Sequence, residues 1–316
     1  MKILVTGASG FVGRALSREL VKCGHVVRGA VRTDDAGRDL PCDSLSIGAI
    51  HGRTDWRAAL KGMDVVVHLA ARTHVMSDEA ADPLAAYRQM NVDATMRLAH
   101  QASVAGVQRL LYLSSVKVNG ERTTSHPFRE YDPPAPEDAY GLSKLEAEIR
   151  LTEWCTSSGP QLVILRSPLV YGAGVKGNLL QLMRAIDKGF FLPFAAIRNR
   201  RSLLAVHNLT SAIECCARHP NAASSTFLVA DDLPLSTPDL ARAIAAHMKR
   251  PARLVSVPVP VLRFAGRVLN RSAPVDRLVS SLVVDNRKIA SDLGWRPASS
   301  FEEDIADMVR AYFETR

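Results

Sequence analysis

The amino-acid sequence predicts an α/β fold with a doubly wound parallel sheet, followed by a smaller and mostly helical C-terminal part. Two observations support this class. Short runs rich in β-branched residues alternate with amphipathic helical stretches through the first two thirds of the chain, and a glycine-rich turn joins the first run to the first helix. Such alternation gives parallel strands with right-handed crossovers. The 316 residues exceed one typical core, so we expect two units, residues 1–172 and residues 173–316.

The strands expected in the first unit are short and apolar, as in a sheet that is covered on both faces. They span residues 3–5, 26–31, 64–69, 109–114 and 161–166, and a further strand ends near residues 48–50. The first helix ends at Gly24, a residue type typical of helix C-termini, and its expected inner face consists of Val12, Ala15, Leu16, Leu20 and Cys23. A second helix is expected over residues 83–105.

The pattern changes after residue 172. Helical periodicity dominates, prolines cluster at residues 251–260, and the expected strands shorten to residues 202–206, 226–229 and 254–257. One of these late strands is a candidate to return to the first sheet. The polar, proline-rich stretch at residues 119–139 is a long loop, and a loop of this length inside a compact domain is more often functional than idle.

Composition excludes several protein classes. With 47% hydrophobic and 23% charged residues the chain is neither disordered nor fibrous, and its five cysteines form no disulfide framework and no metal-ligand spacing. No apolar run approaches the length of about 18 residues typical of a membrane span, and the N-terminus does not resemble a signal peptide. We therefore expect a cytoplasmic protein without a metal site. The net charge of +8, with 31 Arg and 9 Lys, leaves a nucleic-acid or anionic ligand open.

A glycine-rich turn connects the first strand to the first helix, with the sequence Thr6-Gly7-Ala8-Ser9-Gly10-Phe11-Val12-Gly13. The first glycine permits the tight turn, the second lets the backbone approach a pyrophosphate, and the third lets the helix pack closely on the strand. The phosphates then meet free N–H groups at the helix N-terminus. The turn predicts a dinucleotide-binding site made by Gly7, Gly10, Phe11, Val12 and Gly13.

The end of the second expected strand bears on the choice of dinucleotide. A site for NAD(H) usually has Asp or Glu there to accept hydrogen bonds from a ribose 2′-hydroxyl. This chain has Arg32 and no carboxylate before Asp34, and a guanidinium pairs well with a 2′-phosphate. Arg14, just after the last glycine, is placed to assist. The sequence therefore favours NADP(H) over NAD(H); stacking of Arg32 on adenine without discrimination is the alternative.

Three side chains form a candidate catalytic group. Lys144 follows Tyr140 by four residues, so its ammonium shares a helix face with the phenol and is expected to lower the phenol's pKa. Ser115 follows Ser114 at the carboxyl end of an expected strand, the edge where ligands bind in such sheets. There Ser115 can hold a substrate oxygen against Tyr140 while a nicotinamide carries hydride. The group predicts redox chemistry at a carbonyl or alcohol carbon.

Taken together, these motifs resemble the extended short-chain dehydrogenase/reductase family and, within it, the nucleotide-sugar epimerases and dehydratases with their Rossmann-type fold. The matching segments are TGASGFVG at residues 6–13, HLAA at 68–71, Asn91-Val92, Ser114-Ser115 and YGLSK at 140–144. The resemblance implies that Tyr140 is the general acid/base and that Lys144 also contacts the nicotinamide ribose. It further implies that Ser114 and Ser115 face the substrate, and that the cofactor site is lined by Leu69, Ala70 and Ala71.

Downstream segments resemble the part of this group that binds a nucleoside diphosphate. Asn178 stands in a stretch similar to the one whose Asn contacts the diphosphate, and Arg201 matches a phosphate-binding Arg. Arg277 is a weaker candidate for a second one. The implied substrate is a nucleoside-diphosphate sugar, with UDP favoured. The resemblance also implies a homodimer, through helices near residues 85–105 and 140–157.

Departures from the group's pattern bear on the reaction. Sugar dehydratases have an acidic pair directly after the catalytic hydroxyl, where this chain has Val116-Lys117, so dehydration is not expected. The run SSVKVNGE at residues 114–121 resembles enzymes of surface polysaccharide synthesis that reduce UDP-4-keto-6-deoxy-N-acetylhexosamines. A reductase exchanges its cofactor and commonly uses NADPH, so together with Arg32 this reduction is the main interpretation. A UDP-hexose 4-epimerase is the alternative, favoured by the 25-residue interval from Ser115 to Tyr140.

Two further interpretations stay open. The run at residues 28–32 also resembles carbonyl reductases that act on non-sugar substrates, and some proteins of this fold are non-catalytic redox sensors or RNA-associated scaffolds. The intact group of Ser115, Tyr140 and Lys144 argues against a scaffold. A nucleic-acid partner is not expected, because no basic run lies among stacking aromatic residues, which make up only 6% of the chain. Most of the Arg excess is expected to be general surface composition.

Overall fold

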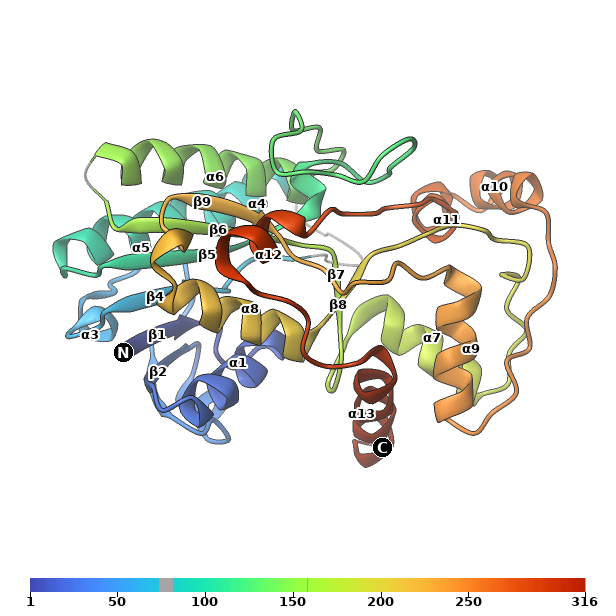
Figure 1. The fold of residues 1–316 in the computed structure, drawn as a ribbon, viewed down its shortest axis with the longest axis horizontal. Coiled ribbons are helices and arrows are strands. Elements are labelled where there is room, and N and C mark those ends of the chain that lie inside the picture. Colours follow the sequence, from blue (N-terminus) through green and yellow to red (C-terminus); the bar gives the residue numbers. More distant parts are fainter. Residues whose placement is uncertain (74–81, 158, 316) are drawn as a thin grey trace.

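The computed structural model describes residues 1–73, 82–157 and 159–315, and within them the largest element is a seven-stranded parallel sheet (Figure 1). Across the sheet the strands are β3 (Asp43–Ser46), β2 (Val26–Val31), β1 (Lys2–Thr6), β4 (Val65–His68), β5 (Arg109–Ser115), β6 (Gln161–Ser167) and β9 (Ser225–Leu228). The chain winds outward from β1 in both directions, so the strand order reverses between β1 and β4. The doubly wound parallel sheet predicted from the sequence is confirmed.

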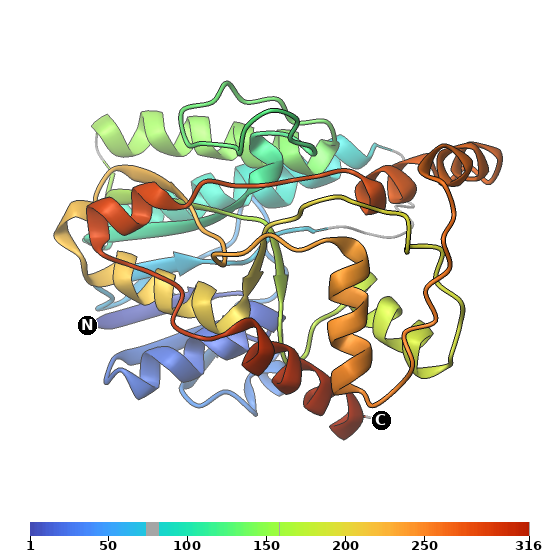
Figure 2. The ribbon, with the colours of Figure 1, turned by 45° about the vertical axis from the view of Figure 1, so that its right-hand side comes forward.

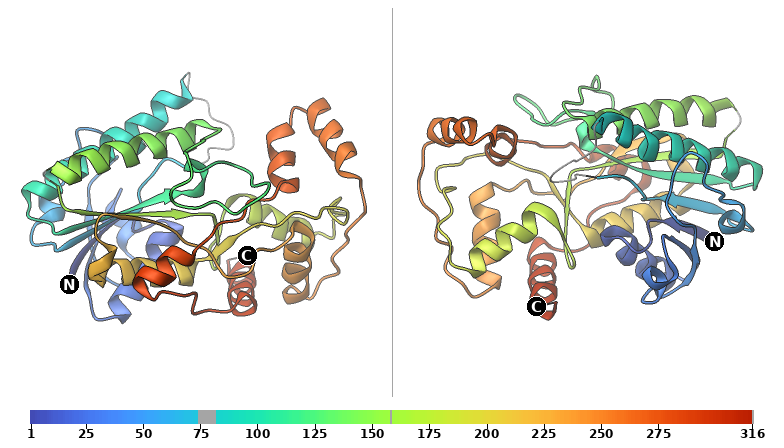
Figure 3. Two further views of the ribbon diagram at one scale, coloured as in Figure 1. Left: turned by 45° about the horizontal axis from the view of Figure 1, so that its top comes forward. Right: turned by 180° about the vertical axis from the view of Figure 1, so that it is seen from behind.

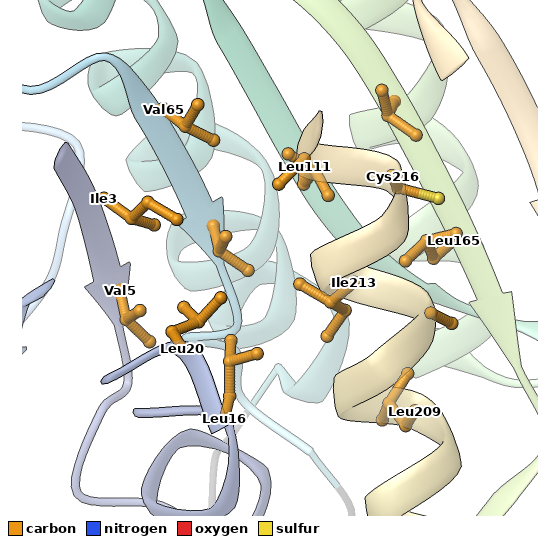
Figure 4. Close-up of a cluster of buried hydrophobic side chains, with 14 of the residues drawn as sticks. Ile3, Val5, Leu16, Leu20, Val65, Leu111, Leu165, Leu209, Ile213 and Cys216 are labelled. Carbon is orange, nitrogen blue, oxygen red and sulfur yellow. The ribbon is translucent and has the colours of Figure 1, made fainter. Parts of the chain in front are cut away.

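Helices cover both faces of this sheet (Figures 1 and 2). One face carries α1 (Phe11–Lys22), α8 (Val206–Arg218) and α12 (Arg287–Leu293), and the other carries α3 (Arg57–Leu60), α5 (Ala94–Val104) and α6 (Ala139–Ser157). Because both faces are covered, successive strand residues are buried on opposite sides: Val65 and Val67 join one apolar cluster and Val66 the other. Figure 4 shows Leu16 and Ile213 among the side chains of the first cluster, with Ile213 projecting from α8 toward the strands.

A smaller region lies beyond the carboxyl ends of the strands (Figure 3). Its parallel pair of strands, β7 (Leu169–Tyr171) and β8 (Leu203–Ala205), is packed by α7 (Gly177–Asp187), α9 (Thr237–His247) and α13 (Phe301–Glu314). A helical hairpin of α10 (Val259–Val268) and α11 (Ser272–Val279) lies at its periphery. The remaining short elements are α2 (Asp34–Gly37), α4 (Pro83–Arg88), η1 (Gln89–Asp93), η2 (Val116–Val118) and η3 (Pro220–Ala222). Among the described residues no helix is both long and apolar enough to cross a bilayer.

Several expected elements differ from the structure. Residues 254–257 form no strand, because Leu254 meets only an irregular segment, in an isolated bridge with Leu192. The third strand ends at Ser46 rather than near residues 48–50. The helix expected over residues 83–105 is interrupted by the π-helical turn η1. Cys23 at the end of α1 is exposed, since the helix has already passed the edge of the core there.

Segments from beyond residue 172 complete the large sheet. Strand β9 pairs with β6, and α8 packs against α1. The buried guanidinium of Arg109, at the start of β5, fixes the end of α8: its Nη1 donates to the carbonyl oxygens of Cys216, Ala217 and His219 at 2.8–3.0 Å. The expected division at residue 172 stays a prediction. Of the elements after residue 172, α8, β9 and α12 lie with the first unit, whereas α7, α9 and α13 lie apart from it.

Replacing Arg109 tests how strongly this contact joins the two halves of the chain. We expect Arg109→Met to lower the free energy of unfolding by about 3 kcal/mol, because three carbonyl oxygens at the end of α8 lose their donor. Urea unfolding followed by circular dichroism measures the change. Arg18→Met, at an exposed position on α1, is the matched control and should leave the midpoint unchanged. Equal midpoints for both variants would contradict the assignment.

Candidate active site

The candidate site lies at the carboxyl ends of β1, β4 and β5, where the strand order reverses and ligands bind in such sheets. The turn after β1 and the chain after β4 touch here. The backbone N–H groups of Leu69 and Ala70 both donate to Thr6 Oγ1 at 3.2 Å. Gly7 has φ of +67°, and a Cβ there would lie 3.0 Å from Ala70 N. Partly buried Ala71 follows directly, so the predicted cofactor residues from two distant segments are adjacent.

The glycine turn sets α1 close against β1. A Cβ on Gly13 would lie 2.2 Å from Gly7 O, so no other residue fits without moving the helix. Gly10 is the N-cap of α1, and a Cβ there would meet only Gly7 O, at 3.1 Å. The backbone before α1 is therefore open to a ligand, and the turn fits a dinucleotide pyrophosphate. Phe11 packs instead against the apolar cluster of the C-terminal region, while Val12 packs on the sheet.

The two arginines expected near the ribose differ in their contacts. Arg32 lies exposed directly after β2, at the carboxyl edge of the sheet. Arg14 folds back on the turn: its Nε donates to Ser9 O at 3.1 Å, and its Nη1 lies 3.7 Å from Asp39. A third arginine of this region, Arg28, is structural, because its Nη1 donates to three carbonyl oxygens at the end of α3.

Lys144 is held rigidly beneath the site. Its side chain is buried, and its Nζ donates to Leu113 O at 2.8 Å and lies 4.4 Å above the Tyr112 ring. Burial lowers the pKa of Lys144 to about 7, although the Glu148 carboxylate acts in the opposite direction. One of its three N–H donors is used by Leu113, which leaves the others for a ligand.

Tyr140 lies close to both proposed partners. The Lys144 Nζ is 6.0 Å from the centre of its ring, and a hydrogen bond links its phenol to Ser115. The sequence predicted that Lys144 lowers the pKa of Tyr140. The structure shows the opposite net direction: burial raises the pKa of Tyr140 above its usual value, Asp138 adds to the rise, and only the Ser115 hydrogen bond opposes it. Desolvation outweighs the cation here, so the phenol is protonated at neutral pH.

The two serines at the end of β5 face different surroundings. Ser114 Oγ is buried, with no hydrogen-bond partner among the described residues. Ser115 is half-buried, and its Oγ accepts a hydrogen bond from Lys117 N at 3.3 Å, which caps the short helix η2. An unsatisfied buried hydroxyl beside the Tyr140 partner is suited to a ligand oxygen.

A buried polar network behind the site was not predicted from the sequence. His68 lies between Thr6 Oγ1 at 2.7 Å and Thr95 Oγ1 at 2.9 Å, and burial lowers its pKa to about 3. Asn91, in the π-turn η1, binds both backbone groups of Arg72 and donates to Ser143 Oγ at 2.9 Å. The network ties β1, the chain after β4 and α6 together. Its signal in the sequence is the pair of family segments that contain His68 and Asn91, whose contacts were not predicted.

A charged cluster at the edge of the site was also missed. The Lys117 ammonium binds Asp138, and it lies 2.7 Å from Glu121 Oε1. Asp138 precedes α6, and its Oδ1 accepts from Gly141 N at 2.7 Å, so it fixes the helix start that carries Tyr140. An Asp two residues before a helical Tyr is the N-cap signal that could have revealed it. The cluster connects the segment after Ser115 to the start of α6.

The predicted substrate residues are partly brought together. Arg201 is buried, and its Nη1 donates to Arg277 O at 2.7 Å and Ser280 O at 3.1 Å, so it holds the end of α11. The Arg277 guanidinium reaches the charged cluster, with Nε 3.2 Å from Glu121 Oε2. Asn178 lies exposed in the first turn of α7, and no contact in the described part of the chain joins it to these arginines.

Comparison with known proteins agrees with this geometry. The model of a family described as the NAD dependent epimerase/dehydratase family matches residues 3–230. The chain belongs to this family. The expectation of an NAD(P)-dependent enzyme from the epimerase/dehydratase group is thereby confirmed, and the non-catalytic interpretation gains no support.

The alignments of this chain with individual relatives cover nearly the full length of both proteins. A UDP-glucose 4-epimerase from Vibrio cholerae is 41% identical over 317 residues, covering 99% of this chain and 95% of the relative. MoeE5, solved with UDP-glucose and NAD, is 25% identical with a TM-score of 0.78, covering 100% and 99%. A UDP-glucuronic acid 4-epimerase from Bacillus cereus, solved with NAD, has a TM-score of 0.81 at 19% identity over 99% and 97%, which shows the fold alone.

Replacing Lys117 tests whether the charged cluster positions Tyr140. We expect Lys117→Met to lower kcat about tenfold with little change in KM, because Asp138 loses its nearer counter-ion beside Tyr140 and keeps only Arg277, at 3.6 Å. The less compensated carboxylate should also raise the pKa of Tyr140 further, so the acidic limb of the pH–rate profile moves to higher pH. Lys117→Arg should restore both properties. Lys176→Met, at an exposed position, is the control; an unshifted profile for Lys117→Met would rule out positioning.

Proposed function

We propose that the protein is a UDP-hexose 4-epimerase. The observation that carries the proposal is the arrangement of half-buried Tyr140 and Ser115 with buried Lys144, at the same edge of the sheet as a glycine turn that fits a dinucleotide. The Vibrio cholerae relative is a UDP-glucose 4-epimerase, and a 26% identical Escherichia coli O157:H7 relative, over 84% of this chain and 77% of its own, is a 4-epimerase of an N-acetylglucosaminyl-diphospho-undecaprenol. Both names support chemistry at C4. Reduction of a 4-keto sugar, the main interpretation of the sequence, has less support.

The side chains suit reversible proton transfer at the C4 hydroxyl. A bound nicotinamide would supply reversible hydride transfer at C4, with the hydride returned to the opposite face of the sugar, so the cycle would have no net oxidation. Tyr140 would act as the phenolate, which positive charge on the bound cofactor would favour over the resting phenol. In that form it accepts the hydroxyl proton in the first half and returns it to the carbonyl oxygen in the second. Ser115 holds that oxygen by a hydrogen bond. Lys144, fixed by Leu113 O, keeps free donors for the cofactor ribose.

The diphosphate would lie toward the C-terminal region. Arg201 and Arg277 are adjacent there, and we propose that their positive charges and the amide of Asn178 hold the phosphates. Arg277 is 35% exposed and already reaches Glu121, so substrate binding would draw its guanidinium away from that carboxylate. UDP is the nucleotide that the relatives' names favour.

Interconversion of UDP-glucose and UDP-galactose tests the reaction. We expect both sugars to appear from either one, as followed by proton NMR, without net consumption of dinucleotide. Tyr140→Phe should lower kcat about a hundredfold or more while dinucleotide binding is retained, because only the proton carrier is removed. Consumption of one NADPH for each molecule of a 4-keto nucleotide sugar, with no interconversion of the hexoses, would instead establish the reductase.

Cofactor preference is a separate prediction, and we infer NADP(H) over NAD(H) from Arg32. Its exposed guanidinium at the end of β2 is available to a 2′-phosphate. Arg32→Ala should weaken NADP(H) binding about tenfold or more and leave NAD(H) binding unchanged, as measured by fluorescence titration. Two of the similar structures contain NAD, which is the competing cofactor. Tighter binding of NAD(H) than of NADP(H) by the unaltered protein would overturn the preference.

We also propose a cytoplasmic homodimer formed through α4, α5 and α6. Ion pairs join these helices into one face, since Arg88 lies 2.6 Å from Glu146 and Arg150 lies 3.3 Å from Asp93. Ile149 on the same face is 49% exposed, and the proposed dimer would cover it. Nucleic acid has no part in the proposal.

A further inference from the structure

Positive charge is concentrated at one end of the molecule. Residues 188–201 and 240–275 contain eleven Lys and Arg and no Asp or Glu, so the rest of the chain has a net formal charge of −3. In space these two segments meet, through the bridge between Leu192 and Leu254, and they form the end of the molecule farthest from the N-terminus (Figure 1). The two segments contain nine of the 31 Arg, so positive charge that no acidic residue of the same segment offsets is concentrated at this end.

The helix α10 at this end has an apolar face that the structure leaves uncovered. Four of its large side chains, including the C-cap residue, are exposed by 53–69%: Val261, Phe264, Val268 and Leu269. Their spacing of three, four and one residues puts them on one side of the helix. The opposite side packs on α11, where a Cβ on Gly266 would lie 2.9 Å from Val275. The apolar side therefore faces outward.

Arginines border this apolar face. Arg263 and Arg267 follow each other at helical spacing along one margin, and Arg271 begins the turn to α11. Arg263 is paired with Asp276 at 3.2 Å, whereas Arg267 and Arg271 make no ion pair within the described part of the chain. A long Arg side chain at the margin of an apolar face can lay its aliphatic part along that face while its guanidinium stays in contact with water.

The same end carries three more exposed apolar side chains. Phe190 is 59%, Phe191 71% and Val255 42% exposed. The Arg253 guanidinium lies 5.5 Å above the Phe191 ring, so a basic group also adjoins an exposed apolar side chain here. Seven of the sixteen exposed large hydrophobic side chains in the described residues belong to the two acid-free segments.

We propose that this end of the molecule docks on an anionic lipid bilayer, with α10 lying in the plane of the interface. Its apolar side chains would enter the acyl boundary while Arg267 and Arg271 pair with lipid phosphates, which is how amphipathic basic helices bind membrane surfaces. A second copy of the chain fits this face poorly, because Arg267 and Arg271, which no carboxylate in the described part of the chain pairs with, would repel their counterparts in the other copy. The docking element also adjoins the candidate site, since Arg277 of α11 reaches Glu121.

Co-sedimentation with vesicles tests the docking independently of any sugar substrate. We expect the protein to bind phosphatidylcholine vesicles that contain phosphatidylglycerol about tenfold more tightly than phosphatidylcholine alone, with the difference lost at high salt. Phe264→Ser with Val268→Ser, and separately Arg267→Glu with Arg271→Glu, should each weaken this binding about tenfold. Turnover of free nucleotide sugar and the melting temperature should not change, since none of the four residues lies in the candidate site.

Matched controls use exposed residues on helices of the large sheet. Val21→Ser with Val104→Ser removes exposed apolar groups from α1 and α5, and Arg18→Glu with Lys22→Glu reverses charge on α1. These variants should bind vesicles as the unaltered protein does. The proposal is overturned if the unaltered protein stays in the supernatant, if both lipids bind it equally, or if the controls lose as much affinity. Light scattering that shows a dimer dissociated by Phe264→Ser with Val268→Ser, without vesicle binding, would assign the face to a second copy.

Discussion

The contact between the Gly7 carbonyl and Gly13 fixes the distance between β1 and α1, and the site is built outward from it. A side chain at residue 13 would meet that oxygen at 2.2 Å. With the helix this close, its N-terminal N–H groups point over the end of β1, where Thr6 also receives the N–H groups of Leu69 and Ala70. One packing distance between a helix and a strand thus determines where the backbone N–H groups of α1 meet an anion and where the chain after β4 lies beside them.

Burial, rather than the pairing of charges, governs the electrostatics of the catalytic group. Spacing alone places Lys144 beside Tyr140, but desolvation lowers the pKa of the lysine to about 7 and raises that of the tyrosine. Burial therefore opposes the charged form of both groups in the protein by itself. A phenol with a raised pKa gives up its proton less readily, so formation of the phenolate depends on positive charge near the ring, such as charge that accompanies a ligand. Asp138 acts against the phenolate, and the ion pair with Lys117 offsets that carboxylate.

The sequence predicted the features that depend on local periodicity and missed those that depend on long-range contact. Parallel strands, the glycine turn and the Tyr140–Lys144 spacing follow from patterns of a few residues. The absence of the strand expected at residues 254–257 does not follow from such a pattern, because it depends on what lies opposite Leu254. In the same way Arg201, predicted as a phosphate ligand, also holds the end of α11 through carbonyl oxygens about 76 to 79 residues away in sequence. Side-chain type does not tell which buried acceptor a guanidinium will find.

The net charge is another property whose meaning depends on long-range contacts, because the fold decides where the charged side chains lie. A net charge of +8 alone says little about the binding partner, because arginines scattered over the surface and arginines gathered on one face give the same net charge. Two acid-free segments that are distant in the chain become one surface only because residues near 192 and 254 pair in space. The exposed face of α10 lies on that surface, so its apolar side chains and its positive charge act on the same partner. An apolar face alone would favour self-association, whereas unpaired arginines at its margin oppose it and favour an anionic interface.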